Sequence, residues 1–207
     1  MYVLHWERMS GAIAPQALMA EMGVPFEKKP VDMAADAHKA DAYRRLCPTM
    51  RVPALEAPDG EVIGESGAMV GLLGERHPEA ELVPAPGDPD RATFLFWLFY
   101  MASVGYPTFS RAWHPEQFTR EPEAEASISA VAEGDLETLF GIIEGAIGGA
   151  PHFLDRGFSA LDIYLAMIAR WAPNRPALFA RNRRVAAVCA AVEERMASGA
   201  VFREHFD

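Results

Sequence analysis

The chain has 207 residues, of which 50% are hydrophobic and 23% are charged, and its formal net charge is -10. This length and composition fit one compact two-lobed protein with a large buried core. An acidic chain repels phosphate backbones, so we do not expect it to bind nucleic acid.

The first predicted elements form a strand-helix-strand unit. Residues 2–6 are a short apolar run typical of a buried strand, and apolar residues at helical spacing over 13–22 predict the first helix. Pro15 falls in the first turn of this helix and Gly23 just past its end, which is the usual punctuation. Residues 26–31 follow as a second strand. A unit of this length favours parallel pairing of the two strands.

A second group of elements completes an α/β region. Residues 37–46 predict only a short helix in a polar segment. Two short strands then flank the turn at Asp59-Gly60, which predicts a hairpin. Residues 66–76 predict a helix with apolar residues on one side. The order within residues 1–77 is therefore β-α-β followed by β-β-α.

A proline-rich connector separates this region from an all-helical one. Residues 78–90 contain four prolines, and we place the domain boundary there. Every pattern over residues 91–207 is helical. Residues 94–104 are apolar almost all round, which predicts a central, buried helix that is too short to span a bilayer.

Cysteine usage and the start of the chain indicate the compartment. Cys47 and Cys189 are far apart in sequence and have no metal-like spacing, so neither a disulfide framework nor a metal site is expected. The first residues lack a basic region followed by an apolar stretch, so we do not expect a signal peptide. A reducing cytoplasm is the default location, and no membrane association is expected.

Two short motifs in the α/β region carry binding chemistry. Pro53 opens a strand, where a cis bond after Val52 would turn the Val52 backbone outward to pair with an extended peptide. Glu65-Ser66 stands at a helix start, where backbone N–H groups attract a carboxylate and Glu65 could hold an ammonium. Taken singly, each motif also fits a plain alternative: a trans proline at a sheet edge, and a helix cap with an acidic partner.

In combination, these motifs resemble the glutathione transferase family. Arg51 to Leu55 and Gly64 to Ala68 match the family pattern, in the expected strand order. The resemblance is to cytosolic, bacterial beta-like members, and it implies a thioredoxin-like α/β domain followed by an all-α domain. It also implies that Pro53 is cis, that Val52 pairs with the cysteinyl backbone of glutathione, and that Glu65 and Ser66 hold its γ-glutamyl end.

Two further matches extend the resemblance along the chain. Ser159-x-x-Asp162 is a capping box ahead of an apolar helix, and the family carries this folding signal at a central helix of its second domain. His38-Lys39 resembles the pair that contacts the glycine carboxylate of glutathione in several classes. An exposed polar pair without that role explains His38-Lys39 about as well.

The residue that activates the thiol departs from the family pattern. A transferase stabilises the glutathione thiolate with a donor in the loop after the first strand, where a helix N-terminus assists. In the beta-like register the family's cysteine position is occupied by Gly11, and Ser10 is the only hydroxyl in the loop. We therefore expect Ser10 to be the catalytic donor, with simple capping of the helix as the alternative.

Aromatic residues of the helical region are candidates for the second substrate. Tyr106, Phe109 and Trp113 cluster near its first long helix and could line a pocket for a small hydrophobic electrophile. Some of the aromatic residues there must instead belong to the core.

Together these features predict a glutathione transferase that adds the glutathione thiolate to a hydrophobic electrophile. Glutathione is the co-substrate, no metal is expected, and the family implies a homodimer. A glutathione-dependent isomerase, dehalogenase or ether-cleaving enzyme would use the same thiolate. A member that binds glutathione without catalysis also fits, since the cysteine is missing. A thioredoxin-like oxidoreductase is disfavoured because no cysteine stands near residue 10.

Overall fold

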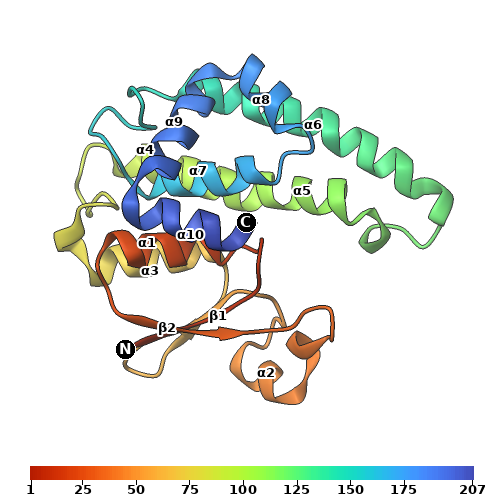
Figure 1. The fold of residues 1–207 in the computed structure, drawn as a ribbon, viewed down its shortest axis with the longest axis horizontal. Helices are drawn as coiled ribbons and strands as arrows, with labels where there is room; N and C mark the ends of the chain where they lie inside the picture. Colours follow the sequence, from red (N-terminus) through yellow and green to blue (C-terminus); the bar gives the residue numbers. More distant parts are fainter. The chain divides into compact units, whose positions relative to one another are not determined.

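The computed structural model describes all residues, 1–207, and divides them into two compact units. The first unit comprises Met1–Asp88 together with Glu193–Asp207, and the second comprises Pro89–Val192. The sequence analysis assigned everything after residue 90 to the helical domain, so the two descriptions differ in the last 15 residues. The physical reason is that the C-terminal helix packs against the first helix of the chain (Figure 1).

The first unit is built on a mixed four-stranded sheet with the order β2-β1-β3-β4. β1 pairs with β2 in parallel, with Trp6 opposite Pro30, and with β3 in antiparallel, with His5 opposite Ala54. β3 and β4 form the antiparallel hairpin that was predicted around Asp59-Gly60. The strands are β1 Tyr2–Trp6, β2 Phe26–Pro30, β3 Ala54–Glu56 and β4 Val62–Ile63.

The helices of the first unit cover the sheet, and α1 supplies much of its core. Residues 12–19 are buried on every side of α1, because α3 and α10 both pack against it. α1 ends at Glu21, and Gly23 two residues later has a φ of +65°, a conformation that glycine adopts without steric cost. The helices are α1 Ile13–Glu21, α2 Asp41–Leu46, α3 Ser66–Arg76 and α10 Met196–Phe206, with 3-10 turns at Ala37–Lys39 and Pro78–Ala80.

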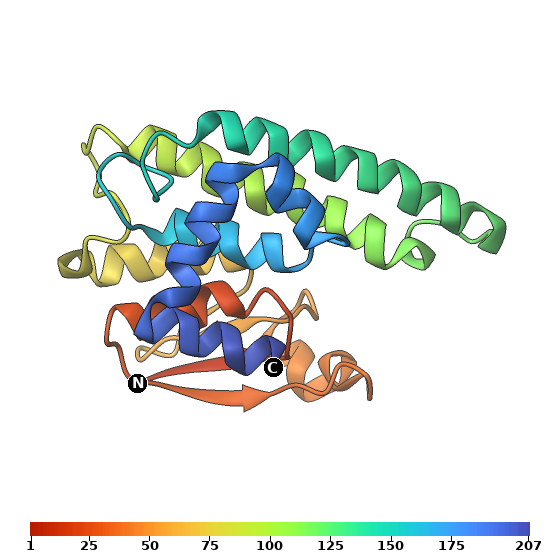
Figure 2. The same cartoon turned by 45° about the horizontal axis from the view of Figure 1, so that its top comes forward.

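The second unit is entirely helical, and α7 is its most buried helix. Residues 160–169 of α7 are all buried. The predicted capping box is confirmed: Ser159 Oγ accepts from the Leu161 N–H at 3.3 Å, and Asp162 Oδ2 accepts from the Ser159 N–H at 2.7 Å. Figure 2 shows the long helix α6 running beside α5. The helices are α4 Arg91–Tyr100, α5 Tyr106–Trp113, α6 Glu125–Ala146, α7 Ala160–Arg170, α8 Arg175–Arg181 and α9 Arg183–Glu194.

A π-helical turn joins α4 to α5. The sequence pattern over 94–104 predicts one regular helix, whereas Met101–Gly105 winds as a π-helix. Gly105 lies close to α6 and α7, since a Cβ there would be 3.5 Å from Leu139 Cδ1 and 3.8 Å from Ile168 Cδ1. Two 3-10 turns, Pro115–Gln117 and Pro122–Ala124, then lead into α6. None of the helices combines the length and the apolar composition that crossing a bilayer would need.

Candidate functional site

The strand pairing gathers the predicted binding segments at one edge of the sheet. Because β1 and β3 are antiparallel, the loop after β1 lies beside the residues that precede β3. β3 and β4 are also antiparallel, so the residues after β4 reach the same edge. Ser10, the Val52-Pro53 step and the Glu65-Ser66 pair, which are far apart in sequence, therefore share one edge of the first unit.

Residues of α2 and its C-terminal end contact the Val52-Pro53 step. The peptide bond is cis, as the family resemblance implies, and the Val52 side chain is buried in a small core with Tyr43 and Cys47. Tyr43 donates its phenol to the Arg51 carbonyl oxygen at 2.8 Å. Burial raises the pKa of Tyr43, so this group remains a donor. These contacts fix the backbone next to the atoms that an extended peptide would pair with.

Glu65 and Ser66 lie where β4 passes into α3. Glu65 has a φ of +60°, which residues other than glycine rarely adopt, and its side chain is exposed. Ser66 is buried and is the first residue of α3, whose first backbone N–H groups lack partners within the helix. An exposed carboxylate thus stands directly beside a helix end that attracts anions, an arrangement that can hold a cation and an anion side by side.

Ser10 makes two hydrogen bonds inside its own loop. Its Oγ donates to the Glu7 carbonyl oxygen at 2.7 Å and accepts from the Ala12 N–H at 3.2 Å. The second contact serves the N–H of Ala12, the residue just before α1, and no side chain caps the start of this helix, so the capping role considered above is not observed. The first contact uses the only proton of the hydroxyl. Donation to a thiolate therefore requires the hydroxyl to turn away from Glu7.

The same loop is tied to the end of β2 by the Glu7 side chain. Its carboxylate accepts from the Arg8 N–H at 2.8 Å and from the Met33 N–H at 3.2 Å. Met9, which lies between Arg8 and Ser10 in the chain, has a φ of +57°. The loop is therefore a defined structure in which one residue is held in the left-handed region.

His38 and Lys39 follow β2, and because β2 is parallel to β1 their segment begins at the same edge. Lys39 Nζ lies 2.8 Å from Asp36 Oδ1, and this ammonium lowers the pKa of the exposed Asp36 carboxyl. His38 Nδ1 is buried and has no hydrogen-bond partner. The lysine is thus already paired with a carboxylate, whereas one ring nitrogen of the histidine is not.

The predicted pocket aromatics have different environments in the second unit. Phe109 is 3% exposed and packs against the rings of Phe140 and Trp171, which assigns it to the core of that unit. Trp113 is 53% exposed and donates its indole N–H to the Trp171 carbonyl oxygen at 2.8 Å. Tyr106 is half-buried and lies edge-on to Trp171.

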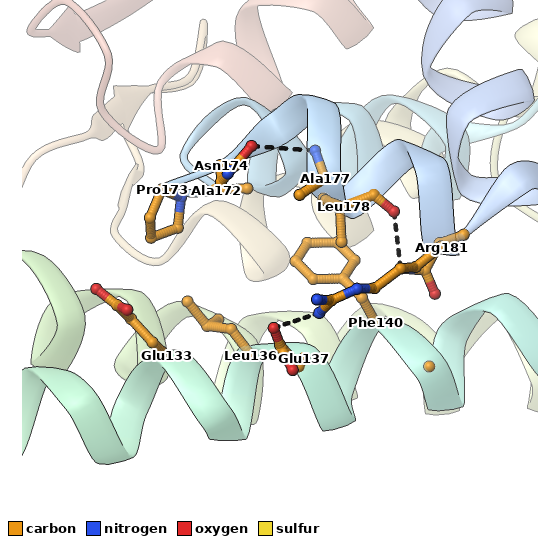
Figure 3. A pocket seen from close by; sticks show the side chains of 12 residues that line it. Glu133, Leu136, Glu137, Phe140, Ala172, Pro173, Asn174, Ala177, Leu178 and Arg181 are labelled. Carbon is orange, nitrogen blue, oxygen red and sulfur yellow. Dashed lines mark hydrogen bonds and ion pairs between the residues drawn. The ribbon is translucent and has the colours of Figure 1, made fainter.

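A separate cavity of about 320 Å³ opens between α6 and α8 of the second unit (Figure 3). Leu136, Phe140 and Leu178 contribute its apolar surface, and Glu137 and Arg181 form an ion pair across it. None of the residues predicted from the sequence as site residues lines this cavity.

A comparison with known protein families bears on the sheet edge that carries the candidate site. Residues 15–76 match the family model of the glutathione S-transferase N-terminal domain. The matched segment contains both the cis Val52-Pro53 step and the Glu65-Ser66 pair. This domain is typical of glutathione transferases, the family that the sequence motifs resemble.

Relatives and solved structures extend the similarity over the chain. Glutathione S-transferase GstA of Escherichia coli O157:H7 is 25% identical over 162 residues, 78% of this chain and 77% of the relative. A maleylacetoacetate isomerase of Pseudomonas aeruginosa is 31% identical over 93 residues, 44% of this chain and 43% of the relative. A glutathione transferase homologue from Sulfitobacter, solved with bound glutathione, superposes with a TM-score of 0.88 over 99% of this chain and 98% of that one. Its 22% identity makes this last likeness one of fold.

Domain match and fold agree: residues 15–76 carry the glutathione S-transferase N-terminal domain, and the whole chain has the fold of a glutathione transferase. The predicted thioredoxin-like domain followed by helices is confirmed. Two residues that contact the candidate edge escaped the sequence analysis: Tyr43 and His205. No spacing signals them, because Tyr43 acts on a backbone oxygen 8 residues away and His205 contacts a loop 196 residues away.

Proposed function

We propose that the protein is a glutathione transferase that binds glutathione at the sheet edge of its first unit and adds the thiolate to a small hydrophobic electrophile. The observation that carries the proposal is the convergence of the cis Val52-Pro53 step and the Glu65-Ser66 pair at one edge. Neither motif alone would identify the ligand, but both sit where one extended tripeptide could reach them.

Each binding residue has a defined role in this proposal. The Val52 backbone pairs with the cysteinyl residue of glutathione as an added strand. Glu65 holds the ammonium of the γ-glutamyl end, while Ser66 and the start of α3 hold its carboxylate. His38 and Lys39 take the glycine carboxylate, for which Lys39 must exchange its Asp36 partner.

Catalysis in this proposal depends on Ser10. The thiol of free glutathione is mostly protonated at neutral pH, as a cysteine thiol is. When glutathione binds, the Ser10 hydroxyl turns from the Glu7 carbonyl to the sulfur and stabilises the thiolate, with the start of α1 assisting. The thiol proton passes to water. The sulfur then forms a bond to the electrophilic carbon, and the leaving group departs with the electrons of its own bond.

Tyr106 and Trp113 are the proposed contacts for the hydrophobic co-substrate, since both present ring surface that is not fully buried. Phe96 and Phe99 of α4 are 60% and 54% exposed, and this apolar surface supports the expected homodimer. A cytoplasmic location, where reduced glutathione is abundant, suits a chain in which neither cysteine forms a disulfide.

A glutathione-dependent isomerase is the second candidate. The observation that favours it is the 31% identity with a maleylacetoacetate isomerase, which is higher than the identity with GstA although the matched segment is shorter. In this reaction the same thiolate adds to a conjugated double bond and leaves after rotation about the resulting single bond. A member that binds without catalysis is the third candidate, and the engagement of the Ser10 proton by Glu7 favours it.

The deciding experiment compares wild type with Ser10→Ala. We expect the substitution to raise the pKa of the bound glutathione thiol and to lower kcat/KM with a generic electrophile about tenfold to a hundredfold, since a hydrogen bond to a charged group is lost. The dissociation constant of glutathione should change little.

Ser103→Ala is the matched control, because Ser103 Oγ also donates to a backbone carbonyl, that of Phe99, at 2.7 Å. It should leave the thiol pKa and turnover unchanged. Turnover by wild type that survives in Ser10→Ala with an unchanged thiol pKa would remove Ser10 from the mechanism. Glutathione binding without turnover of any electrophile or isomerisable alkene would favour the binding-protein candidate.

A further inference from the structure

The last turn of α10 reaches the loop that carries Ser10. His205 is 0% exposed, and its Nδ1 accepts a hydrogen bond from the Met9 N–H at 3.2 Å. The other ring nitrogen, Nε2, lies 2.9 Å from Gln16 Oε1 on α1. The ring edge also packs against Trp6 at the end of β1, with ring centroids 5.0 Å apart. One side chain thus touches the end of β1, the loop and α1.

These contacts require one form of the imidazole. The Met9 N–H is a donor, so Nδ1 must carry a lone pair, and the proton must reside on Nε2, where it is donated to Gln16. Burial lowers the pKa of His205 to about 4, which keeps the ring neutral near neutral pH. Lys28 and Arg8 oppose the charged form as well, while Glu204 favours it. A protonated ring would place a second N–H against that of Met9.

The loop needs such an external acceptor. Met9 has a φ of +57°, and its N–H makes no hydrogen bond to a backbone oxygen. The other loop contacts do not involve the Met9 N–H: Glu7 binds the Arg8 and Met33 N–H groups, the Arg8 side chain donates to the His205 carbonyl oxygen at 3.4 Å, and Ser10 binds within the loop. The His205 ring is the contact that holds the backbone N–H directly before Ser10.

We propose that His205 is a positioning residue for the thiolate site: by accepting from the Met9 N–H, it holds the backbone of the Glu7–Gly11 loop so that the Ser10 hydroxyl can turn from Glu7 to the sulfur when glutathione binds. This inference rests on the proposed function for its catalytic consequence. The structural part, that the imidazole fixes the loop, stands without it.

α10 offers an internal control for a merely structural role. Its other end is anchored to the same helix, α1, by Arg195, which donates to both carboxylate oxygens of Glu21 at 3.0 and 2.8 Å. Glu21 also accepts from the Ser198 N–H at 3.0 Å. Arg195→Met therefore loosens α10 from α1 without touching the loop.

The test compares three full-length variants with wild type. In His205→Asn the side-chain oxygen falls near the position of Nδ1 and keeps an acceptor for Met9. In His205→Gln the amide reaches the position of Nε2 and leaves the Met9 N–H without its acceptor. The measurements are hydrogen exchange of the Glu7–Gly11 segment without glutathione, the pKa of the bound glutathione thiol, the dissociation constant of glutathione, and the melting temperature.

We expect exchange in the loop to rise about tenfold in His205→Gln and to stay near wild type in His205→Asn, as expected for one lost hydrogen bond. The thiol pKa should rise and kcat should fall only in His205→Gln, with glutathione affinity unchanged. Arg195→Met should lower the melting temperature and change neither loop exchange nor thiol pKa.

Three outcomes separate this inference from the proposed function. Equal loop exchange in His205→Gln and His205→Asn would overturn the positioning role, whatever the activity. Arg195→Met reproducing the effects of His205→Gln would also overturn it, because α10 docking alone would then explain them. If wild type shows no turnover and loop exchange is faster in His205→Gln only, the proposed function would be contradicted. The role of His205 in holding the loop would still be supported.

Discussion

At the scale of single residues, Tyr43 links α2 to the binding edge. Its phenol donates to the Arg51 carbonyl immediately before the Val52-Pro53 step, at 2.8 Å. Tyr43→Phe removes this bond and leaves the carbonyl only the weak contact from the Cys47 thiol at 3.7 Å, so we expect a loss of about 1–3 kcal/mol. We expect the dissociation constant of glutathione to rise while the pKa of the bound thiol stays constant. Calorimetric titration and a thiolate absorbance titration check the two parts, and an unchanged dissociation constant would contradict the first.

His205 also predicts a pH dependence of stability. Its pKa is about 4 in the folded protein and near 6.5 when exposed, so between these values only the unfolded chain binds the proton. The free energy of unfolding is therefore full above pH 6.5 and falls as the pH drops toward 4, by about 3 kcal/mol at most.

Urea unfolding across this pH range measures the effect, and His205→Asn, which has no titrating ring, is the control. The variant should lack the slope between the two pKa values, apart from what other groups contribute. Parallel slopes in both proteins would mean that His205 is not the group responsible.

The sequence predicts residues whose partners are near in the chain. The capping box at Ser159 and Asp162 spans three positions, and the structure confirms both of its bonds. The cis bond at Pro53 followed from the family resemblance and is confirmed. His205 could not be predicted, because its partner Met9 stands 196 residues away and neither residue type signals the contact. The roles of Ser10, Glu65 and Ser66 remain predictions that only ligand-bound experiments test.

At the scale of elements, α3 shows how one glycine sets a packing distance. A Cβ on Gly74 would lie 2.4 Å from Val83 Cβ, whereas one on Gly71 of the same helix meets nothing within 4 Å. We expect Gly74→Ala to cost about 1–3 kcal/mol, because the branched Val83 side chain has to shift.

Gly71→Ala is the matched control and should stabilise the protein by about 0.5–1 kcal/mol, because alanine favours the helix. Denaturant unfolding of both variants gives the two signs. Stabilisation by both substitutions would show that α3 can move away from Val83 at no cost.

Predicted element bounds hold best where the pattern is regular. The strand over residues 2–6 and the helix over 66–76 are observed with the predicted ends. The expected helix over 37–46 is divided into a 3-10 turn, Ala37–Lys39, and α2, since Ala40 is extended. The π-helical turn at Met101–Gly105 could not be predicted from the sequence, because a run of apolar residues on all sides of a helix has no periodicity that would reveal it.

At the scale of the whole molecule, the first unit is discontinuous in sequence. Phe202 of α10 belongs to it and is almost fully buried, while Phe140 of α6 is equally buried in the second unit. Phe202→Ala should cost about 3–5 kcal/mol and raise native-state hydrogen exchange in α1 and β1 more than in α7.

Phe140→Ala, its counterpart, should raise exchange in α5 and α7 more than in α1. Exchange measured by mass spectrometry resolves these helices. Equal increases across all 207 residues in both variants would contradict the division, because the chain would then open as a single cooperative unit.

The position of α10 has a consequence for how the protein is made. A ribosome that releases residues 1–88 must still synthesise residues 89–192 before α10 emerges. At about 5–20 residues per second this delay is on the order of ten seconds. During it, the face of α1 that α10 will cover is open to solvent and to other nascent chains. The unit whose synthesis begins first is thus the last to be completed. We expect a chaperone that binds the nascent chain to recognise the apolar face of α1 that α10 later covers.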